Sequence, residues 1–366
     1  MNICQNEALY EKNQKMLKET YRENQVVIAS HLIDILAQML TGVMLGDHVQ
    51  LWMIALLLPF DIQLTSQVRK FERFLSDKRV DVKKYFMPFV KAMHTSLGND
   101  IAYIIIDCPK AGPKCRTLVI GSFYQNTALP LCWKTFTGKK GHLKGEKHRE
   151  LLEQIPELFL SHQRVVVLGD AEFGNDEVIG WLKNKGWGFV FRVQKRYKTH
   201  GKGEDWVSIQ ELHKRIGLKE GETKHWEDMT YTKQHKHAGL TITVDWGVGH
   251  KEPICLVSSL SASQNPHLIY EMRYAIETLF GNHKSRGFQF ARTHLTNPEQ
   301  IDRLFLVLVI ATCQVLGLGT HLIITEQSHL VDRTDRRDLS LFQIGFRWFR
   351  RLCALNRLDE FEMCFQ

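Results

Sequence analysis

The sequence predicts a mixed α/β protein with a helical region at each end, and three observations support this fold class. Residues 1–95 carry apolar positions only at helical spacing. The middle of the chain alternates apolar, β-branched runs with helical segments, which indicates a sheet with helices packed on it. A long apolar helix at 298–318 is suited to cover that sheet.

The amino-terminal region, residues 1–96, is predicted to be a helical DNA-binding domain. Residues 66–91 contain eight basic and three acidic side chains, and apolar residues recur there with helical spacing. Short amphipathic helices with basic outer faces are typical of DNA-binding modules. We therefore predict DNA contacts for Arg69, Lys70 and Arg73. A solvated charged face without a ligand is the alternative.

Residues 97–194 are predicted to begin the central sheet. Apolar runs at 102–106, 117–124 and 129–136 indicate an antiparallel meander. The next elements are a helix at 146–161, a fully apolar strand at 165–170 typical of a buried parallel strand, a helix at 176–185 capped by Asn175, and a strand at 187–193. Three strands, a helix, a strand, a helix and a strand is the order of the RNase H-like fold, which we predict for the core.

The alternation of helix and strand breaks in residues 195–261, which are predicted to form a β-rich insertion. Strands are expected there at 230–232, 240–246 and 254–260. Residues 262–325 are predicted to return to the core with two helices. Residues 326–366 form an Arg-rich tail that we expect to be helical.

The helix predicted at 265–284 carries a narrow polar stripe. Asn265 is a candidate cap, Pro266 suits the first turn and Gly287 is a candidate stop. At ~100° per residue, four polar side chains fall within about 60° of one another, with apolar residues beside them. These are Tyr270, Arg273, Glu277 and Lys284. The stripe suits a helix that faces a metal-bound phosphate, and the alternative is a solvated face with Arg273 and Glu277 as an ordinary i,i+4 ion pair.

Two aspartates, Asp107 and Asp170, each end an apolar strand, and these strands are predicted to be neighbours. Carboxylates at strand ends can converge on one cation, and Glu277 would supply a third. Three oxygen ligands without a thiolate suit Mg²⁺, and two such ions ~4 Å apart can activate water or a 3′-hydroxyl. Glu172 and Asp176 are rivals near Asp170, but both lie beyond the strand end, and Asp176 is better explained by the first turn of a helix.

The composition predicts a soluble, cytoplasmic protein without a membrane association. The formal charge of +8 favours a polyanionic partner without identifying it. The eight cysteines are scattered and form no metal-binding spacing, so we expect reduced thiols. The apolar run at 304–318 is shorter than the ~20 residues that a membrane span requires.

These residues carry a resemblance to a known family. The spacing Tyr270-x2-Arg273-x3-Glu277-x6-Lys284 resembles the YREK signature of the DDE transposases of bacterial insertion sequences, in the group named for insertion sequence four. The segment Gly169-Asp170-Ala171-Glu172-Phe173-Gly174 is similar to the second-aspartate motif of that family. Segments 190–193, 335–340 and 68–75 are also similar to family patterns, so the resemblance spans most of the chain.

The resemblance implies cut-and-paste DNA transposition by Mg²⁺-dependent hydrolysis and strand transfer, often through a hairpin at the transposon end. It implies Asp107, Asp170 and Glu277 as the catalytic and metal-binding triad, with Mn²⁺ as a substitute ion. Tyr270, Arg273 and Lys284 would hold the DNA end, and Arg192 is a further candidate contact. The expected partners are double-stranded DNA, as transposon ends and target, and a second copy of the chain in a homodimeric DNA complex. Bound to DNA, the protein would be associated with the bacterial nucleoid.

Some features leave alternatives open. In the insertion, Trp246, with Trp226 second, is the candidate to stack on a flipped base, and a tryptophan in the small core of the insertion is the alternative. Gly281-Asn282 departs from the bulkier residues of the family, which would loosen the helix or let DNA approach closely. A catalytically inactive or domesticated DNA-binding protein of the same fold is the alternative function, although all charged positions of the signature are present.

Overall fold

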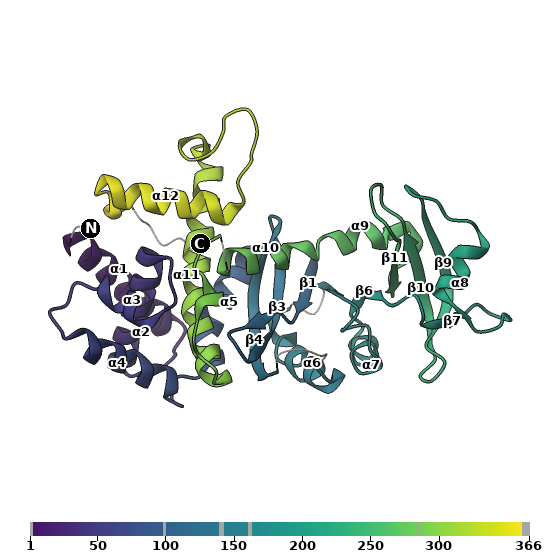
Figure 1. The fold of residues 1–366 in the computed structure, drawn as a ribbon, viewed down its shortest axis with the longest axis horizontal. Helices are drawn as coiled ribbons and strands as arrows, with labels where there is room; N and C mark the ends of the chain where they lie inside the picture. The colour runs from purple at the N-terminus through teal and green to yellow at the C-terminus, as the bar shows by residue number, and fades with distance from the viewer. Residues whose placement is uncertain (1–2, 98–99, 139–142, 160–162, 285, 361–366) are drawn as a thin grey trace.

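The computed structural model describes residues 3–97, 100–138, 143–159, 163–284 and 286–360. A long mixed sheet runs through the protein, and a helical region packs at one end of it (Figure 1). Helices α9 (Pro266–Glu271) and α10 (Tyr274–His283) run along one side of the sheet, and α6 (Gly145–Leu152) and α7 (Asp176–Lys185) lie on the other (Figure 1). The predicted α/β class is confirmed.

The amino-terminal region is helical, as predicted. Its most apolar helix, α2, is buried over most of its length, so it forms the core of this region. The helices are α1 (Ile3–Glu23), α2 (Ser30–Gly46), α3 (Leu51–Leu56), α4 (Leu64–Ser76) and α5 (Val82–Leu97).

The first strands form the predicted antiparallel meander. They are β1 (Ile101–Asp107), β3 (Cys115–Tyr124) and β4 (Thr127–Thr137), with the short β2 (Lys110–Ala111) beside β3. Two further strands, β5 (Arg164–Gly169) and β6 (Gly188–Val193), continue the sheet parallel to β1. This part of the sheet therefore has the order β4-β3-β1-β5-β6.

The helices between these strands follow their local signals to different degrees. Asn175 accepts a hydrogen bond from the Val178 amide and Gly186 ends the helix at φ 68°, so α7 has the predicted bounds. The helix α6 is shorter than predicted, because Pro156 cannot continue it and a 3₁₀ turn, η1 (Pro156–Leu158), follows. Its predicted end at Ser161 lies outside the described residues.

The segment predicted as a β-rich insertion extends the same sheet. Its last strand, β11 (Ile254–Ser258), pairs antiparallel with β6, which gives the backbone groups of β6 a partner on that side. The strand predicted at 230–232 is shorter than the observed β9 (Thr223–Tyr231). The charged and polar side chains of β9 are exposed or half-buried over most of its length, so its sequence lacks a clear apolar alternation. The remaining elements are β7 (Lys198–His200), β8 (Val207–Ser208), α8 (Ile209–Arg215), β9 (Thr223–Tyr231) and β10 (His237–Asp245).

The single helix predicted at 265–284 is wrong in detail, since it is divided into α9 and α10. At the junction, the amides of Met272, Arg273 and Ala275 each donate to the carbonyl three residues earlier, so the chain makes a tighter turn there. Pro266 occupies the first turn as predicted, but Asn265 makes no side-chain capping hydrogen bond. The helix ends at His283, just before Lys284. Short 3₁₀ turns flank this region as η2 (Ala262–Gln264) and η3 (Phe290–Arg292).

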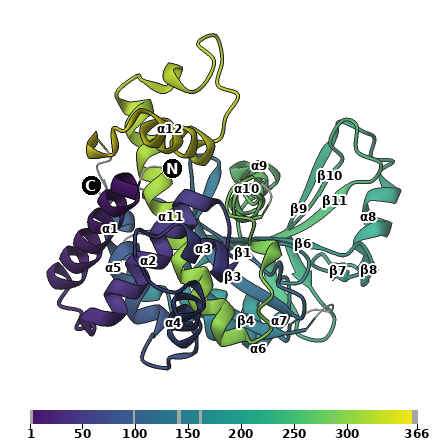
Figure 2. The same cartoon turned by 60° about the vertical axis from the view of Figure 1, so that its left-hand side comes forward.

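The helix α11 (Pro298–Ile324) connects the helical region with the sheet (Figure 2). It packs against α2, α4 and α5 on one side, against β4 on another, and against α12 (Leu341–Leu355). Helix α11 is long and apolar enough to cross a membrane. However, 72% of its most apolar stretch is buried inside the protein, and the core helix of a globular protein can have the same length and composition. It is longer than predicted, since it continues beyond residue 318.

The carboxy-terminal region is partly helical, as expected. Helix α12 crosses α11 closely at Gly345. A glycine is required there, because a Cβ would collide with the Val315 carbonyl oxygen of α11. Short 3₁₀ turns precede and follow it as η4 (Ser328–Leu330) and η5 (Leu358–Glu360), and residues 361–366 lie outside the described ranges. None of the seven cysteines in the described ranges forms a disulfide.

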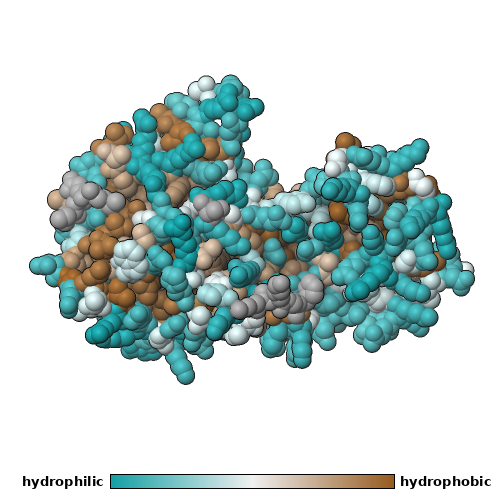
Figure 3. Space-filling model, in the orientation of Figure 1, coloured by the Kyte–Doolittle hydropathy of each residue, from teal (hydrophilic) through white to brown (hydrophobic). Residues whose placement is uncertain are grey.

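The molecular outline is hollowed between the carboxy-terminal helical region and the far end of the sheet (Figure 3). Helices α9 and α10 lie at the base of this hollow, as comparison with Figure 1 shows. Its visible rims are mainly hydrophilic (Figure 3).

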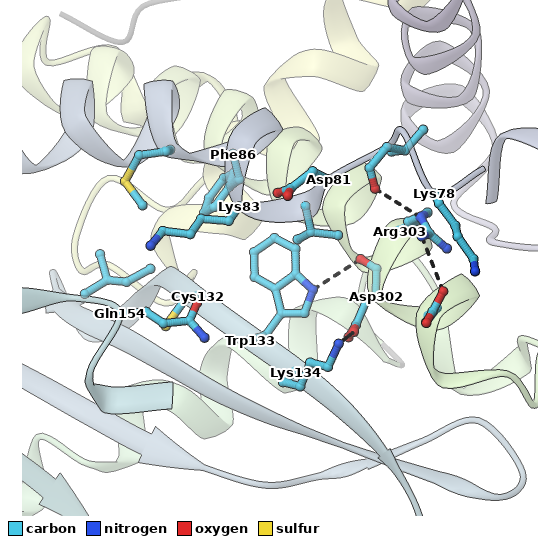
Figure 4. Close-up of a pocket in the computed structure, with 15 residues that line it drawn as sticks. Lys78, Asp81, Lys83, Phe86, Cys132, Trp133, Lys134, Gln154, Asp302 and Arg303 are labelled. Atoms are coloured by element: carbon cyan, nitrogen blue, oxygen red, sulfur yellow. Dashed lines mark hydrogen bonds and ion pairs between the residues drawn. The ribbon is translucent and has the colours of Figure 1, made fainter. Parts of the chain in front are cut away.

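Polar contacts around the start of α11 attach the amino-terminal helices to the sheet (Figure 4). Arg303 is buried and donates to the backbone carbonyls of Leu75, in the last turn of α4 (2.9 Å), and of Val80, between α4 and α5 (3.1 Å). Its neighbour Asp302 accepts the Thr135 amide of β4 at 2.8 Å, and Lys134 lies 3.7 Å from its other oxygen. Two consecutive residues of α11 therefore hold two separate parts of the chain.

Asp302 makes stability dependent on pH. Burial raises its pKa from the ordinary 3.8 to about 6, although Thr135 and Lys134 oppose the shift. Because the folded-state pKa lies above the unfolded one, folding favours the protonated form, and stability falls as pH rises from about 4 through 6. The difference between 3.8 and about 6 corresponds to about 3 kcal/mol.

We predict that Asp302→Asn raises the free energy of unfolding by about 1–3 kcal/mol at pH 7.5 and has little effect at pH 4. Chemical denaturation at both pH values measures the difference. Asp81→Asn is the matched control, because Asp81 is an exposed carboxylate that lines the same pocket as Asp302 (Figure 4). A gain that is equal in the two variants, or that does not depend on pH, contradicts the prediction.

Candidate active site

Asp107 and Asp170 lie side by side at the same edge of the sheet. The strands β1 and β5 pair in parallel, and the last paired residues are Ile106 and Gly169. Each aspartate directly follows one of these residues. The prediction that the two aspartate-bearing strands are neighbours is confirmed.

The turns after both strands have the same local design. The Cys108 amide donates to Asp107 Oδ1 and the Ala171 amide donates to Asp170 Oδ1, each at 2.7 Å. Both carboxylates are therefore oriented by the residue that follows them. Gly169 lets the second turn fold back closely, since a Cβ there would lie 2.9 Å from the Phe173 side chain.

The charge environment of Asp107 places Glu277 in the same neighbourhood. The pKa of Asp107 is raised, first by burial and further by repulsion from Asp170 and Glu277. The Cys108 amide and Arg273 oppose this shift by stabilising the charged form. Asp170 and Glu277 thus both lie within electrostatic range of Asp107.

Glu277 forms an ion pair in this structure. Arg273 NH2 lies 2.6 Å from Glu277 Oε1, so the i,i+4 pair that the sequence left as the alternative is present. Arg273 is buried, with its guanidinium 5.7 Å from the Tyr270 ring centre and 5.1 Å from that of Tyr274. The Glu277 side chain is 53% exposed. The phosphate contact expected of Arg273 stays a prediction.

The other candidate DNA contacts of the core differ in position. Arg192, on β6, is half exposed and its NH1 lies 3.9 Å from Asp170 Oδ1, so it belongs to the carboxylate cluster. Tyr270 is buried, and burial raises the pKa of its phenol. Lys284 follows the end of α10 with its Nζ 5.9 Å from the Phe280 ring centre. At Gly281, the guanidinium of Arg286 occupies the space of a side chain.

The remaining predicted residues lie on other elements. Trp246 is half buried at the end of β10, and its Nε1 donates to the His250 carbonyl at 2.8 Å, as a tryptophan in the small core of the insertion would. On α4, Arg69 and Arg73 are exposed, whereas Lys70 turns inward to donate to Gln38 Oε1 at 3.1 Å. Helix α4 packs on α2, α3 and α11 rather than on the strands that end in Asp107 and Asp170.

The donor set of the carboxylate cluster fits a hard divalent cation in its chemistry. Its ligands would be carboxylate oxygens alone, and a cation would stabilise the charged form of Asp107, whose pKa is raised by burial and by the two neighbouring carboxylates. As they stand, no three acidic, histidine or cysteine side chains in the described ranges are gathered closely enough to enclose an ion. Glu277 would have to leave Arg273 to join the two aspartates.

One part of the site has no recognisable signal in the sequence. Glu172 appeared only as a rival ligand, but its side chain is 9% exposed and lies 3.3 Å from Arg116 NH2. Arg116 lies on β3, 54 positions before Asp170 in the chain (170 − 116), where only the sheet brings it close. Tyr274 was likewise missed, and its place beside Arg273 follows from the division between α9 and α10.

Removal of Arg273 should destabilise the fold. We predict that Arg273→Ala lowers the free energy of unfolding by about 1–3 kcal/mol, because the fold loses the contacts of this guanidinium with two tyrosine rings and with Glu277. The loss of the ion pair contributes little of this, because solvent partly screens Glu277. Urea denaturation measures the loss. Arg192→Gln, at a half-exposed position, is the control and should stay within about 0.5 kcal/mol of the parent. Equal effects of both substitutions contradict the structural role of Arg273.

The chain is similar to known proteins in sequence and in fold. The family profile described as "Transposase DDE domain" matches residues 109–314, which include Asp170 and Glu277 and begin two residues after Asp107. No curated protein sequence matched the chain. Among solved structures, it is similar to that titled "Cryo-EM structure of piggyBac transposase synaptic complex with hairpin DNA (SNHP)", with 12% identity, 92% of this chain and 73% of that chain covered, and a TM-score of 0.44. The likeness is too weak to carry an argument about function.

Proposed function

Because this chain belongs to the transposase DDE domain family, whose profile matches more than half of its 366 residues, we propose that it catalyses cut-and-paste transposition of a bacterial insertion sequence. The reaction would consist of phosphodiester hydrolysis followed by strand transfer, with a hairpin intermediate at the transposon end as one route. The YREK spacing from Tyr270 to Lys284 supports assignment to the group named for insertion sequence four.

One observation carries this proposal. The parallel register of β1 and β5 sets Asp107 and Asp170 beside each other, and Glu277 from α10 lies within electrostatic range. Carboxylates on neighbouring strand ends and on a packed helix form a rigid acidic cluster. The order β4-β3-β1-β5-β6, with three antiparallel strands followed by two parallel ones, supports an RNase H-like core. We retain the predicted domain limits at 96, 194, 261 and 325.

The metal proposal follows from the donor set. Asp107, Asp170 and Glu277 would hold Mg²⁺, with Mn²⁺ able to substitute. When bound, the ion would activate the attacking oxygen and stabilise the leaving oxygen at phosphorus. In the free protein Arg273 pairs with Glu277, so a DNA phosphate that takes over Arg273 would free the Glu277 carboxylate.

The proposed DNA path lies along α9 and α10. Arg192, Tyr270, Arg273 and Lys284 would contact the DNA end, since guanidinium and ammonium groups neutralise phosphates and a phenol donates a hydrogen bond. The hollow over these helices supports this path (Figure 3). Exposed Arg69 and Arg73 of α4, with Lys70, would bind more distant DNA, and Trp246 would stack on a base if it can leave its contact with the His250 carbonyl.

We also propose the setting in which the protein acts. Its partners would be double-stranded transposon ends, target DNA and a second copy of the chain, because two ends have to be cut and joined together. The protein would reside in the bacterial cytoplasm and associate with the nucleoid through DNA.

The triad is tested by isosteric substitution. We predict that Asp107→Asn, Asp170→Asn and Glu277→Gln each reduce Mg²⁺-dependent cleavage of a transposon-end duplex by at least about 1,000-fold, because each removes a charged ligand, while end binding stays within a few-fold. Gel assays of cleavage and binding measure both. Robust cleavage by one variant removes that residue from the triad. A parent that binds ends but cleaves none would instead identify an inactive DNA-binding protein.

The phosphate contacts are tested by salt dependence. We predict that Lys284→Ala weakens end binding and makes the slope of log affinity against log salt shallower by about one, because one fewer counterion is released. Fluorescence anisotropy at several salt concentrations measures the slope. Lys147→Ala removes an exposed lysine of α6, on the other side of the sheet, and should leave the slope unchanged (Figure 1). An unchanged slope for Lys284→Ala rules out the phosphate contact.

A further inference from the structure

The Glu172 side chain is only 9% exposed although it lies in the loop after β5. Its Oε1 accepts the Leu143 amide at 2.8 Å and lies 3.4 Å from His148 Nε2. Its Oε2 lies 3.3 Å from Arg116 NH2. Both oxygens of this carboxylate are therefore engaged by other parts of the chain, which distinguishes Glu172 from a carboxylate open to a ligand.

Arg116 contacts the turn after β1 at the same time. Its Nε and NH2 donate to the Cys108 carbonyl oxygen at 3.1 and 2.6 Å. The next residue of β3, Thr117, donates its amide to the Pro109 carbonyl at 3.0 Å. The two residues after Asp107 are thus both held by β3.

Asp107 pairs with Val119 of β3, but no backbone pairing joins Asp107 directly to Asp170. Backbone pairing between β1 and β5 ends at Ile106 and Gly169, one residue before each aspartate. Beyond that point, the Cys108 carbonyl, the Arg116 guanidinium and the Glu172 carboxylate form a continuous connection from one turn to the other.

We propose that Arg116 and Glu172 form a brace that sets the separation of Asp107 and Asp170, and that both are positioning residues for the cation of the acidic cluster. This inference rests on the proposed function. The two aspartates repel each other, so a connection that opposes their separation keeps them ready for a cation. Mg²⁺ tolerates little deviation from its preferred geometry, which makes the spacing of its ligands important.

The brace is tested by binding of Mn²⁺ to the full-length protein without DNA, measured by isothermal titration calorimetry. We expect Arg116→Gln and Glu172→Gln each to weaken Mn²⁺ binding by about 10- to 100-fold, as substitutions behind metal ligands do. The double variant should bind Mn²⁺ no more weakly than the single variant with the lower Mn²⁺ affinity, because the two residues act as one unit. Raised Mn²⁺ concentration should restore DNA cleavage in each variant.

A matched control and a second readout separate this role from general destabilisation. Glu153→Gln removes an exposed carboxylate directly after α6 that pairs with Arg149 at 2.8 Å, and it should leave Mn²⁺ binding unchanged. Hydrogen exchange of the metal-free protein reports the brace directly. In Glu172→Gln, the amides of 108–111 should exchange faster together with those of 171–174, and Arg116→Gln should show the same pattern.

The outcomes have distinct meanings. Loss of Mn²⁺ binding in Glu172→Gln with a normal Arg116→Gln makes Glu172 a ligand and overturns the brace. Parent-like Mn²⁺ binding in both variants, or faster exchange only in the segment that is mutated, overturns it as well. A parent that binds no Mn²⁺ without DNA contradicts a metal site preformed on the two aspartates, and the exchange data then decide the brace independently.

Discussion

The parallel pairing of β1 with β5 is the interaction on which the site depends. Its register ends with Ile106 opposite Gly169, which sets Asp107 and Asp170 at adjacent positions on the same edge of the sheet. A shift of one residue would turn one of these side chains to the other face. The buried residues Ile104, Ile105, Val167 and Leu168 keep this register, because apolar side chains of both strands are packed inside the protein.

The electrostatics of the site follow from that arrangement. Burial first, and then repulsion from Asp170 and Glu277, disfavours the charged form of Asp107 and raises its pKa. Arg273 and Arg192 offset part of the repulsion, one by pairing with Glu277 and the other from 3.9 Å beside Asp170. Both guanidinium groups could exchange a carboxylate for a DNA phosphate, since a guanidinium binds either group. The acidic cluster and its DNA contacts are therefore best understood as one system.

The site also depends on distant packing. Helix α11 contacts the amino-terminal helices, β4 and α12, and through Arg303 and Asp302 it joins two regions far apart in sequence. On the same helix, Thr312 Oγ1 lies 2.7 Å from the buried Nε2 of His283, so α11 supports the end of α10 from behind. Burial lowers the pKa of His283 to about 3, which keeps this ring neutral. The helix that carries Glu277 is thereby held against the core by a neutral contact.

The sequence by itself determined the local elements and the identity of the acidic residues. Strong local signals, such as the Asn175 cap with Gly186 and the apolar run of β5, specify their elements because the neighbouring residues alone decide the backbone. The sequence indicated the three acidic residues as candidate metal ligands by their positions. Asp107 and Asp170 each end an apolar strand, and Glu277 lies in the polar stripe of a helix. Tertiary structure decided the rest: the division of α9 from α10, the pairing of β11 with β6 and the link between Arg116 and Glu172. The two pairings join groups far apart in the chain, which no periodicity or local propensity encodes. The i,i+4 spacing of Arg273 and Glu277 allowed an ion pair, and the fold decided that this pair forms.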